Sequence, residues 1–444
     1  MISVIKDIKL HRHVFSLALP MVLSNITVPL LSLVDAAVIG HLDKSWYLGG
    51  VAIGGSMISM VFMLLLFLRM ATTGLTAQAF GRKNSQQIAV MLLQGVTLAW
   101  ILAGILLLIH QPLSQLIFSL SNASEQVIFY GQQYFEVRIW SAPAALANLV
   151  IMGWLLGTQN SRYPMWLLIF TNLVNILLDL LFVMGFGWQV KGAAFASVIA
   201  DYSSFGLGLW FVAKQWRNLS LPSWKKQISA IFTNIGQLLH LNKNIMLRSL
   251  CLQVVFAFMA FQGAALGDDI VAANAVLMSF LMMISYAMDG FAYAMEAMVG
   301  NAVGAKNKNQ LIRVMQSSTF LCLIICLVMS VIFFIFGDQL IGLISNIAEV
   351  RHDAAIYLPW LAILPLVSMW CFLLDGIFVG AAKGKEMRNS MFIATISFFI
   401  GWWLLQGFGN HALWSGMLIF MAMRGVTLGG EFYRQWQTGR FIAE

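Results

Sequence analysis

Charged side chains are scarce in this sequence of 444 residues. Only 10% of the residues are Asp, Glu, Lys or Arg, whereas soluble globular proteins carry roughly 25%. So few charges cannot cover a water-facing surface, and the composition therefore excludes a soluble enzyme and an intrinsically disordered protein. The 60% of hydrophobic residues indicates instead a protein that lies within a lipid bilayer.

Cysteines and cofactor motifs are also scarce. The four cysteines (Cys251, Cys322, Cys326 and Cys371) lie in apolar runs without a Cys-x-x-Cys pair. This pattern excludes a secreted disulfide scaffold and favours buried thiols over a metal or redox site. The sequence has no P-loop, no dinucleotide fingerprint and no His-Glu-x-x-His pattern, so we expect no cofactor, no resident metal and no direct drive by ATP.

Long apolar stretches are abundant, and they predict an all-α integral membrane protein. Backbone polar groups in lipid must be satisfied within their own segment, which requires helices, and a span needs about 20 residues. We expect twelve transmembrane helices, at about residues 13–39, 48–70, 88–109, 127–157, 162–186, 190–213, 243–265, 275–300, 311–336, 355–381, 388–407 and 411–433.

The distribution of the 26 Lys and Arg residues predicts the orientation. Four of them lie within spans: Arg69, Arg138, Arg248 and Arg424. If the N-terminus is cytoplasmic, the outer face holds three: Lys44, Lys191 and Arg351. The other 19 then lie on the cytoplasmic face, which is the asymmetry expected when both termini are inside. This asymmetry also explains the net charge of +8 without a nucleic-acid partner.

The second half of the chain repeats the first at one constant offset. Residues 75–84 lie over residues 298–307, Gly153 and Gly157 lie over Gly376 and Gly380, and residues 40 and 52 lie over residues 263 and 275. Six helices separate the copies, so the repeats are parallel. We expect two pseudo-symmetric six-helix lobes around a central cleft: an N-lobe of residues 1–213 and a C-lobe of residues 243–444. Residues 214–242 would form a cytoplasmic linker with a basic amphipathic helix.

Acidic residues within the first six spans are candidates for coupling transport to an ion. Asp35 lies in the first span and Asp179 in the fifth, where Asn175 precedes it by one turn. Ser197 and Asp201 have the same spacing in the sixth span. Two carboxylates in a low-dielectric pocket resist being charged together, so we expect one of them to exchange a proton. The alternative is a static, hydrogen-bonded polar cluster.

The first span also contains Pro20, four turns before Asp35. Proline in a helix interior frees a carbonyl group and allows a kink. A bend that depends on protonation is therefore geometrically possible, and a fixed kink is the alternative.

The second half of the chain has its own intramembrane acids. Asp289 and Glu296 are seven residues apart in the eighth span, and Asp375 lies in the tenth. These three residues could form a cation site for Na⁺ or protons, or they could pair with arginines such as Arg248 and Arg424.

Several sequence pieces resemble the multidrug and toxic compound extrusion family (MATE), and in particular its DinF-like bacterial branch. The similar pieces are Leu19-Pro-Met-Val-Leu with Val34-Asp-Ala-Ala-Val-Ile-Gly40, Leu156-Gly-Thr-Gln-Asn-Ser-Arg-Tyr-Pro-Met165, Asn175-Ile-Leu-Leu-Asp179 and Ala287-Met-Asp-Gly-Phe-Ala-Tyr-Ala-Met-Glu-Ala-Met-Val-Gly300. The resemblance extends over essentially the whole chain. It implies export of organic cations against H⁺ or Na⁺ by alternating access, across the bacterial inner membrane.

The resemblance also implies roles for individual residues. Asp35 would be the coupling acid together with Asp179, and helix 1 would bend at Pro20. Its polar network would comprise Asn175, Asp179 and Ser197. We also expect Asn148 and Asp201 to belong to the polar network and substrate cavity. Another branch of the family uses acids in spans 7 and 10, but span 7 has no acid here. This departure favours the carboxylates of the N-lobe.

We expect the chain to be a monomeric antiporter of drug-like compounds whose other partners are membrane lipids. Two alternatives stay open: Na⁺ coupling, and a flippase for a lipid-linked precursor. The flippase would need basic side chains, drawn from the four arginines within spans, to hold a phosphate. An intramembrane enzyme is disfavoured because no nucleophile–base pair or set of metal ligands is found at helix spacing.

Overall fold

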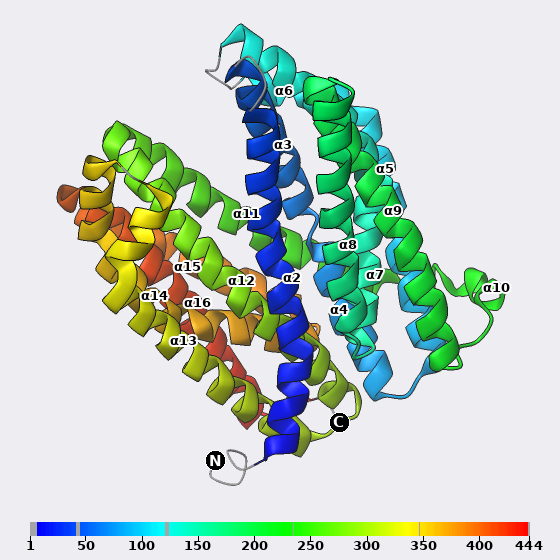
Figure 1. Ribbon diagram of the computed structural model, residues 1–444. Coiled ribbons are helices and arrows are strands. Elements are labelled where there is room, and N and C mark those ends of the chain that lie inside the picture. Colours follow the sequence, from blue (N-terminus) through cyan, green and yellow to red (C-terminus); the bar gives the residue numbers. More distant parts are fainter. Residues whose placement is uncertain (1–6, 41–44, 120–123, 234, 346, 443–444) are drawn as a thin grey trace. The chain divides into compact units, whose positions relative to one another are not determined.

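The computed structural model describes residues 7–40, 45–119, 124–233, 235–345 and 347–442, without the side chains of residues 30–33, 35–37, 40, 45 and 268. The side chain of Asp35 therefore lies outside the described part. All regular elements within these ranges are helices (Figure 1). The chain forms two compact units. We call residues 23–238 the N-terminal unit, and residues 1–22 with 239–444 the C-terminal unit.

The N-terminal unit contains the following elements: the second part of α2 (Ile8–Gly40), α3 (Ser45–Leu64), α4 (Phe67–Gly81), α5 (Ser85–Ser119), α6 (Glu125–Arg138), η1 (Ile139–Ser141), α7 (Ala142–Gly157), α8 (Arg162–Asp179), η2 (Leu180–Gly185), α9 (Gln189–Asn218), α10 (Trp224–Gln227) and η3 (Ile228–Ala230). Helix α3 packs on α6, α4 on α7, and α8 on α9.

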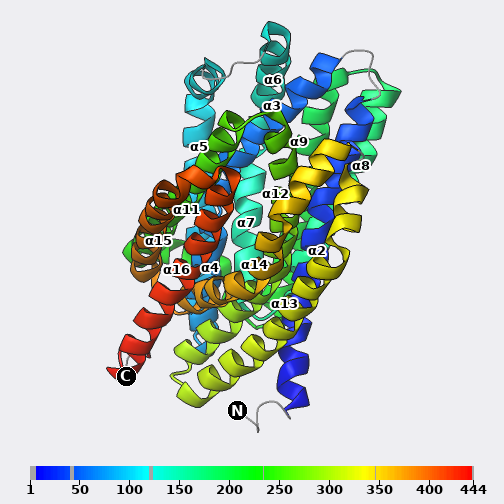
Figure 2. The same cartoon turned by 90° about the vertical axis from the view of Figure 1, so that its left-hand side faces the viewer.

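The C-terminal unit contains the first part of α2, α11 (Ile235–Ala265) from Leu239 onward, and the following elements: α12 (Asp268–Gly304), α13 (Lys308–Ile344), α14 (Ala348–Gly380), α15 (Gly384–Leu405), η4 (Gln406–Phe408) and α16 (Asn410–Gln437). Helix α14 packs on α12, α13 and α16, and α15 packs on α16 (Figure 2).

The number of long apolar helices agrees with the predicted spans. In the described residues, eleven helices are long and apolar enough to cross a membrane. They follow α2, which has 33 residues. The second span consists of α3 and α4, which are separated by a turn at Leu65 and Leu66. The expected all-α membrane architecture is therefore confirmed, with helices that extend several residues beyond most predicted ends.

The backbone repeats itself at the interval that the sequence predicts. Lys83 and Lys306 both have a φ of 55°, and Gln159 and Ala382 have φ values of 63° and 56°. A positive φ is uncommon for residues other than glycine. Two pairs of such residues, both at the offset that relates Gly157 to Gly380, therefore indicate duplicated connections between helices.

Glycines at the repeated positions allow two helix pairs to pack closely. A Cβ atom on Gly157 in α7 would lie 2.7 Å from Thr76 Cβ and 2.9 Å from the Thr73 carbonyl oxygen in α4. A Cβ atom on Gly380 in α14 would lie 2.7 Å from the Glu296 carbonyl oxygen in α12. Only glycine fits contacts of this kind without a shift of the backbone.

The linker differs from its prediction. Residues 224–239 do not form one amphipathic helix, because α10 has four residues, η3 has three, and α11 begins only at Ile235. Gln94 in α5 donates hydrogen bonds to the carbonyl oxygens of Ile231 (2.8 Å) and Thr233 (2.9 Å). These bonds fix the backbone of residues 231–233 against the N-terminal unit in a conformation that does not continue the helix.

The first part of α2 packs within the C-terminal unit. Val14, Leu17, Ala18 and Met21 are buried, and the His11 ring lies 2.7 Å from the Ser317 hydroxyl of α13. The boundary between the compact units thus falls inside α2, two residues after Pro20. The predicted lobe boundaries at residues 213 and 243 stay a prediction.

Candidate functional site

Three buried polar residues of the N-terminal unit come together from two helices. Asn175 in α8 donates a hydrogen bond of 2.7 Å to the Ser197 hydroxyl in α9. Asp179 follows Asn175 by one turn and is 2% exposed. We call Asn175, Asp179 and Ser197 the N-unit polar group. The sequence predicted that these side chains share one region.

The N-unit polar group lies where the regular helix stops. Helix α8 ends at Asp179, and the chain continues through η2 as a π-helix. A π-helical turn is rare, is less regularly hydrogen-bonded, and often occurs at functional sites. Asp179 therefore lies directly before an irregularity of the kind that often occurs at functional sites.

The second part of α2 packs against the elements that carry this group. Val38 and Ile39 share an apolar cluster with Val183 of η2 and Val190 of α9. Closer to the middle of α2, Thr27 accepts a hydrogen bond of 2.5 Å from Asn172 of α8. The segment of α2 that contains Asp35 therefore lies along α8, η2 and α9.

A second polar cluster of the N-terminal unit is an ion pair. Arg138 Nη1 lies 2.7 Å from Asp201 Oδ2, and the Arg138 guanidinium also donates to the Ser141 hydroxyl. Asn148 donates a hydrogen bond of 3.1 Å to the backbone carbonyl oxygen of Asp201. The charge of Asp201 is thus neutralised by an arginine. The sequence analysis assigned Asp201 and Asn148 to the substrate cavity but did not predict that Arg138 pairs with Asp201.

In the C-terminal unit, Asp375 pairs with two arginines. Its Oδ2 atom accepts a hydrogen bond of 2.6 Å from Arg424 in α16 and another from Arg248 in α11. All three residues are less than 9% exposed. One carboxylate and two guanidinium groups together have a net positive charge, which repels a further cation. The sequence left open whether Asp375 belongs to a cation site or pairs with arginines. In the structure it pairs with Arg248 and Arg424.

The two other acids of the predicted C-lobe cation site are both on α12. Asp289 is half-buried and interacts electrostatically with Arg424. Glu296 is 2% exposed. Among the described residues, no three His, Cys, Asp or Glu side chains are placed to hold a metal ion. Asp289, Glu296 and Asp375 therefore do not form a site of that kind in this arrangement.

At the positions of the second repeat that are equivalent to the N-unit polar group, the residues are aromatic. The sequence analysis missed this difference, although the constant offset between the two copies could have revealed it. The counterparts in the C-terminal unit are Phe398 for Asn175, Trp402 for Asp179 and Phe420 for Ser197. The same offset carries Asp35 onto Phe258. The Phe258 ring packs edge-to-face on Phe398 (5.9 Å between centroids) and Trp402 (4.8 Å).

Comparison with known proteins decides the family. The sequence profile of the MatE family matches residues 20–181 and 244–404. The chain belongs to the MatE family. The profile thus matches twice, once in each copy of the repeat.

Relatives of this MatE chain have full-length similarity. It is 46% identical to DNA damage-inducible protein F of Escherichia coli, over 97% of this chain and 94% of that protein. It is 23% identical to the probable multidrug resistance protein NorM of Thermotoga maritima, over 89% of this chain and 84% of that protein. The family consists of multidrug and toxic compound efflux transporters, so this chain is a membrane transporter and not an enzyme.

Solved structures share the fold. The bent form of the Vibrio cholerae MATE transporter VcmN aligns with a TM-score of 0.84 and 22% identity, over 98% of this chain and 99% of that chain. A MATE transporter in the bent conformation aligns with a TM-score of 0.87 and 17% identity, over 99% of both chains. At these identities, the likeness shows the fold alone.

Proposed function

We propose that this transporter exports organic, often cationic, compounds from the cytoplasm in exchange for protons. Asp35 and Asp179 carry the coupling proton, and Asn175 and Ser197 hold the carboxyl groups. Protonation removes negative charge from the site, which lowers its affinity for a cation and favours release of the cargo. Asn148 and Asp201 line the neighbouring substrate cavity, and the protein acts as a monomer in the bacterial inner membrane.

The observation that supports this proposal is the difference between the two copies of the repeat. The fold is compatible with a fully aromatic cluster at these positions, as Phe258, Phe398 and Trp402 demonstrate. Buried polar groups reduce stability unless they are hydrogen-bonded. Polar residues at the equivalent positions of the N-terminal unit are therefore not needed for packing, and we attribute them to function.

The positions of Asp35 and Asp179 along their helices support a shared role in carrying the proton. Thr27 and Asn172 are hydrogen-bonded and set the register of α2 against α8. Asp35 is eight residues beyond Thr27, and Asp179 is seven residues beyond Asn172. As first and fifth spans, the helices run in the same direction, so these intervals correspond to rises of about 12 Å and about 10.5 Å. The backbone positions of residues 35 and 179 are therefore at nearly the same depth along their helices, as joint action of the two acids requires.

Asn175 offers an acceptor for the coupling proton. Its Oδ1 atom is buried and accepts no hydrogen bond from the described residues, while its amide nitrogen donates to Ser197. A protonated carboxyl group is a donor and an ionised one is not. Protonation of an adjacent acid can therefore create a hydrogen bond that the ionised site lacks.

Pro20 supplies the hinge in this proposal. It lies in α2 two residues before the boundary between the compact units, and α2 packs in the C-terminal unit before this boundary and in the N-terminal unit after it. A helix bends most readily at a proline. Bending at Pro20 would thus let the two parts of α2 move separately.

The two alternatives have less support. A flippase needs free arginines for phosphate, but Arg138, Arg248 and Arg424 each pair with an aspartate. A Na⁺ site in the C-terminal unit would use Asp375, which two arginines already occupy. A Na⁺ ion bound at Asp35 and Asp179 is the remaining competitor, and the experiment below includes it.

Drug efflux from proteoliposomes with separately imposed pH and Na⁺ gradients tests the proposal. We expect a pH gradient to drive efflux, and Asp35→Asn and Asp179→Asn each to abolish this response while the protein still folds. Asp338→Asn, an exposed acid in α13, is the matched control and keeps wild-type efflux. Efflux driven by Na⁺ alone, or full activity of Asp35→Asn, would contradict proton coupling.

A further inference from the structure

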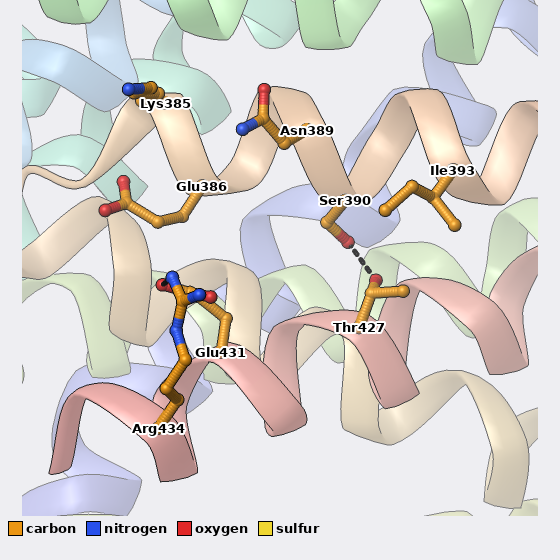
Figure 3. A pocket seen from close by; sticks show the side chains of 8 residues that line it. All are labelled: Lys385, Glu386, Asn389, Ser390, Ile393, Thr427, Glu431 and Arg434. Atoms are coloured by element: carbon orange, nitrogen blue, oxygen red, sulfur yellow. Dashed lines mark hydrogen bonds and ion pairs between the residues drawn. The ribbon is translucent and has the colours of Figure 1, made fainter. Parts of the chain in front are cut away.

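A cavity of about 260 Å³ lies between α15 and α16, within the C-terminal unit. Eight residues line it: Lys385, Glu386, Asn389, Ser390, Ile393, Thr427, Glu431 and Arg434. Figure 3 shows Glu386 extending from α15, and Glu431 with Arg434 extending from α16, toward the same gap between the helices. None of these residues takes part in the proposed coupling site.

The cavity contains both signs of charge in equal number. Gln435 donates hydrogen bonds to Glu386 (3.0 Å) and Glu431 (2.7 Å), which holds the two carboxylates close together. Arg434 pairs with Glu431 at 2.8 Å. Lys385 makes no ion pair with any described residue, and its ammonium group remains available. A ligand that satisfies this arrangement carries a positive group for the carboxylates and a negative group for Lys385.

The cavity also extends from the charged helix ends into the apolar part of the spans. Lys385 is in the first turn of α15 and Arg434 in the last turn of α16, whereas Ile393 and the bonded pair Ser390–Thr427 lie deeper. Eight residues of helix separate Lys385 from Ile393, a rise of about 12 Å. In this deeper part Ile393 is apolar, and the Ser390 and Thr427 hydroxyls bond to each other. A charged entrance above a deeper part without charges matches a lipid whose headgroup is at the interface and whose chains run along the helices.

An aromatic pair occupies the equivalent place in the first repeat. The offset between the copies carries Glu386 onto Tyr163, Arg434 onto Phe211 and Glu431 onto Gly208. The Tyr163 and Phe211 rings stack at 4.4 Å with an interplanar angle of 10°. Because an aromatic pair fills this place in one copy, the charged cavity of the other copy is not a consequence of the fold.

We infer that the cavity between α15 and α16 binds the zwitterionic headgroup of an aminophospholipid such as phosphatidylethanolamine. The primary ammonium group donates hydrogen bonds to Glu386 and Glu431, and the phosphate accepts from Lys385 and from the Asn389 amide. Hydrogen bonds between charged groups are the strong ones, and an ammonium group has three donors to give. On the orientation proposed from the loop charges, the bound lipid belongs to the cytoplasmic leaflet.

Native mass spectrometry of the purified full-length protein tests this inference. The protein is presented with equal amounts of phosphatidylethanolamine, its mono- and dimethylated forms, phosphatidylcholine and phosphatidylglycerol. We expect retention to fall with each added methyl group, by about tenfold from phosphatidylethanolamine to phosphatidylcholine, because methylation removes the donors. Equal retention of these two lipids, or preferential retention of phosphatidylglycerol, would overturn the inference.

Variants locate the site. E386Q combined with E431Q should reduce retention of phosphatidylethanolamine about tenfold, as should K385Q. The controls are E349Q and K243Q, which remove exposed charges elsewhere in the same unit and should leave retention unchanged. Unchanged retention in the cavity variants would contradict the assignment. If those variants fail to fold, the methylation series of the wild-type protein still decides.

A soluble competitor separates a lipid from a free metabolite. Water-soluble phosphoethanolamine carries the same charges without acyl chains. If the ligand is a lipid, this compound should not displace phosphatidylethanolamine even at large excess, because the apolar part of the cavity contributes to binding. Displacement at equal concentration would show that the site serves a soluble phosphoamine, against our inference. Transport is not measured in these experiments, so their outcome is independent of proton coupling.

Discussion

Asp375 illustrates how neighbouring arginines determine what a buried carboxylate can do. Arg248 and Arg424 both donate hydrogen bonds to its Oδ2 atom. Ionised Asp375 compensates part of their charge, and proton uptake would leave two guanidinium groups facing one neutral side chain. These contacts link α11, α14 and α16 through Asp375, and we expect this residue to stabilise the structure and not to carry the coupling ion.

Replacing Asp375 by asparagine should separate these two roles. Breaking a buried ion pair by removing one partner typically costs about 3–5 kcal/mol. We expect Asp375→Asn to lower the melting temperature of the purified protein while efflux keeps its dependence on the pH gradient. A variant with unchanged melting temperature but without pH-driven efflux would instead place coupling in the C-terminal unit.

The sequence could predict which residues are candidates but not how they pair. Charged residues within apolar runs are conspicuous, and all the acids that we selected follow from that rule. Their partners are distant along the chain: Arg248 is 127 residues from Asp375, and Arg138 is 63 residues from Asp201. Such pairings depend on which helix faces adjoin, and periodicity within one helix does not contain that information.

At the scale of elements, the duplicated helix pairs α4–α7 and α12–α14 depend on glycine in the same way. A Cβ atom would lie 2.9 Å from the Thr73 carbonyl oxygen at Gly157, and 2.7 Å from the Glu296 carbonyl oxygen at Gly380. Because backbone atoms cannot move aside as a flexible side chain can, even one methyl group must separate the helices.

Alanine at either position should therefore have the same effect. We expect Gly157→Ala and Gly380→Ala each to destabilise the protein by about 1–3 kcal/mol, the usual cost of overpacking. The reduction would be measured as a lower melting temperature and a lower yield of monodisperse protein. Gly236→Ala in α11 is the control, since no atom lies within 4 Å of its Cβ position. Equal stability of all three variants would mean that these helices can separate freely.

Helix positions were predictable because long apolar runs in lipid have one regular solution, and the repeat was readable from three matching segments. The linker was not predictable in the same way. Trp224, Ile228 and Phe232 recur at helical spacing, but the hydrogen bonds from Gln94 to two carbonyl groups hold the backbone outside a helix. A contact with a residue far away in the sequence thus prevails over local periodicity.

At the scale of the whole molecule, the pH dependence of transport should not originate at the N-terminal end of α2. The backbone N–H of Leu10 and the Arg313 guanidinium hold the pKa of Asp7 below its usual value of 3.8. A carboxylate with a lowered pKa contributes stability above its unfolded pKa, and this contribution is lost only as the pH falls through the lower, folded pKa. Asp7 therefore stays ionised and paired from pH 5 to pH 8.

Asp7→Asn should accordingly weaken the attachment of α2 to α13 by the same amount throughout this pH range. We expect the pH profile of efflux to keep its shape, whereas Asp35→Asn removes the pH response. The comparison requires efflux rates at several pH values for both variants. A changed profile in Asp7→Asn would assign part of the coupling to the Asp7–Arg313 pair.

The orientation of the whole chain is predicted from charge alone, and this prediction has a direct test. The asymmetry of 19 to 3 basic residues predicts that residue 191, in the first turn of α9, faces the outside, and that residue 225 in α10 faces the cytoplasm. We expect Lys191→Cys to react with a membrane-impermeant maleimide on intact cells, and Lys225→Cys to react only after permeabilisation. Three of the four native cysteines are buried and one is half-buried. Labelling of the unmodified protein therefore gives the background that is subtracted from the labelling of each variant. Labelling of Lys225→Cys on intact cells would show that the chain has the opposite orientation. The lipid cavity between α15 and α16 would then face the outer leaflet.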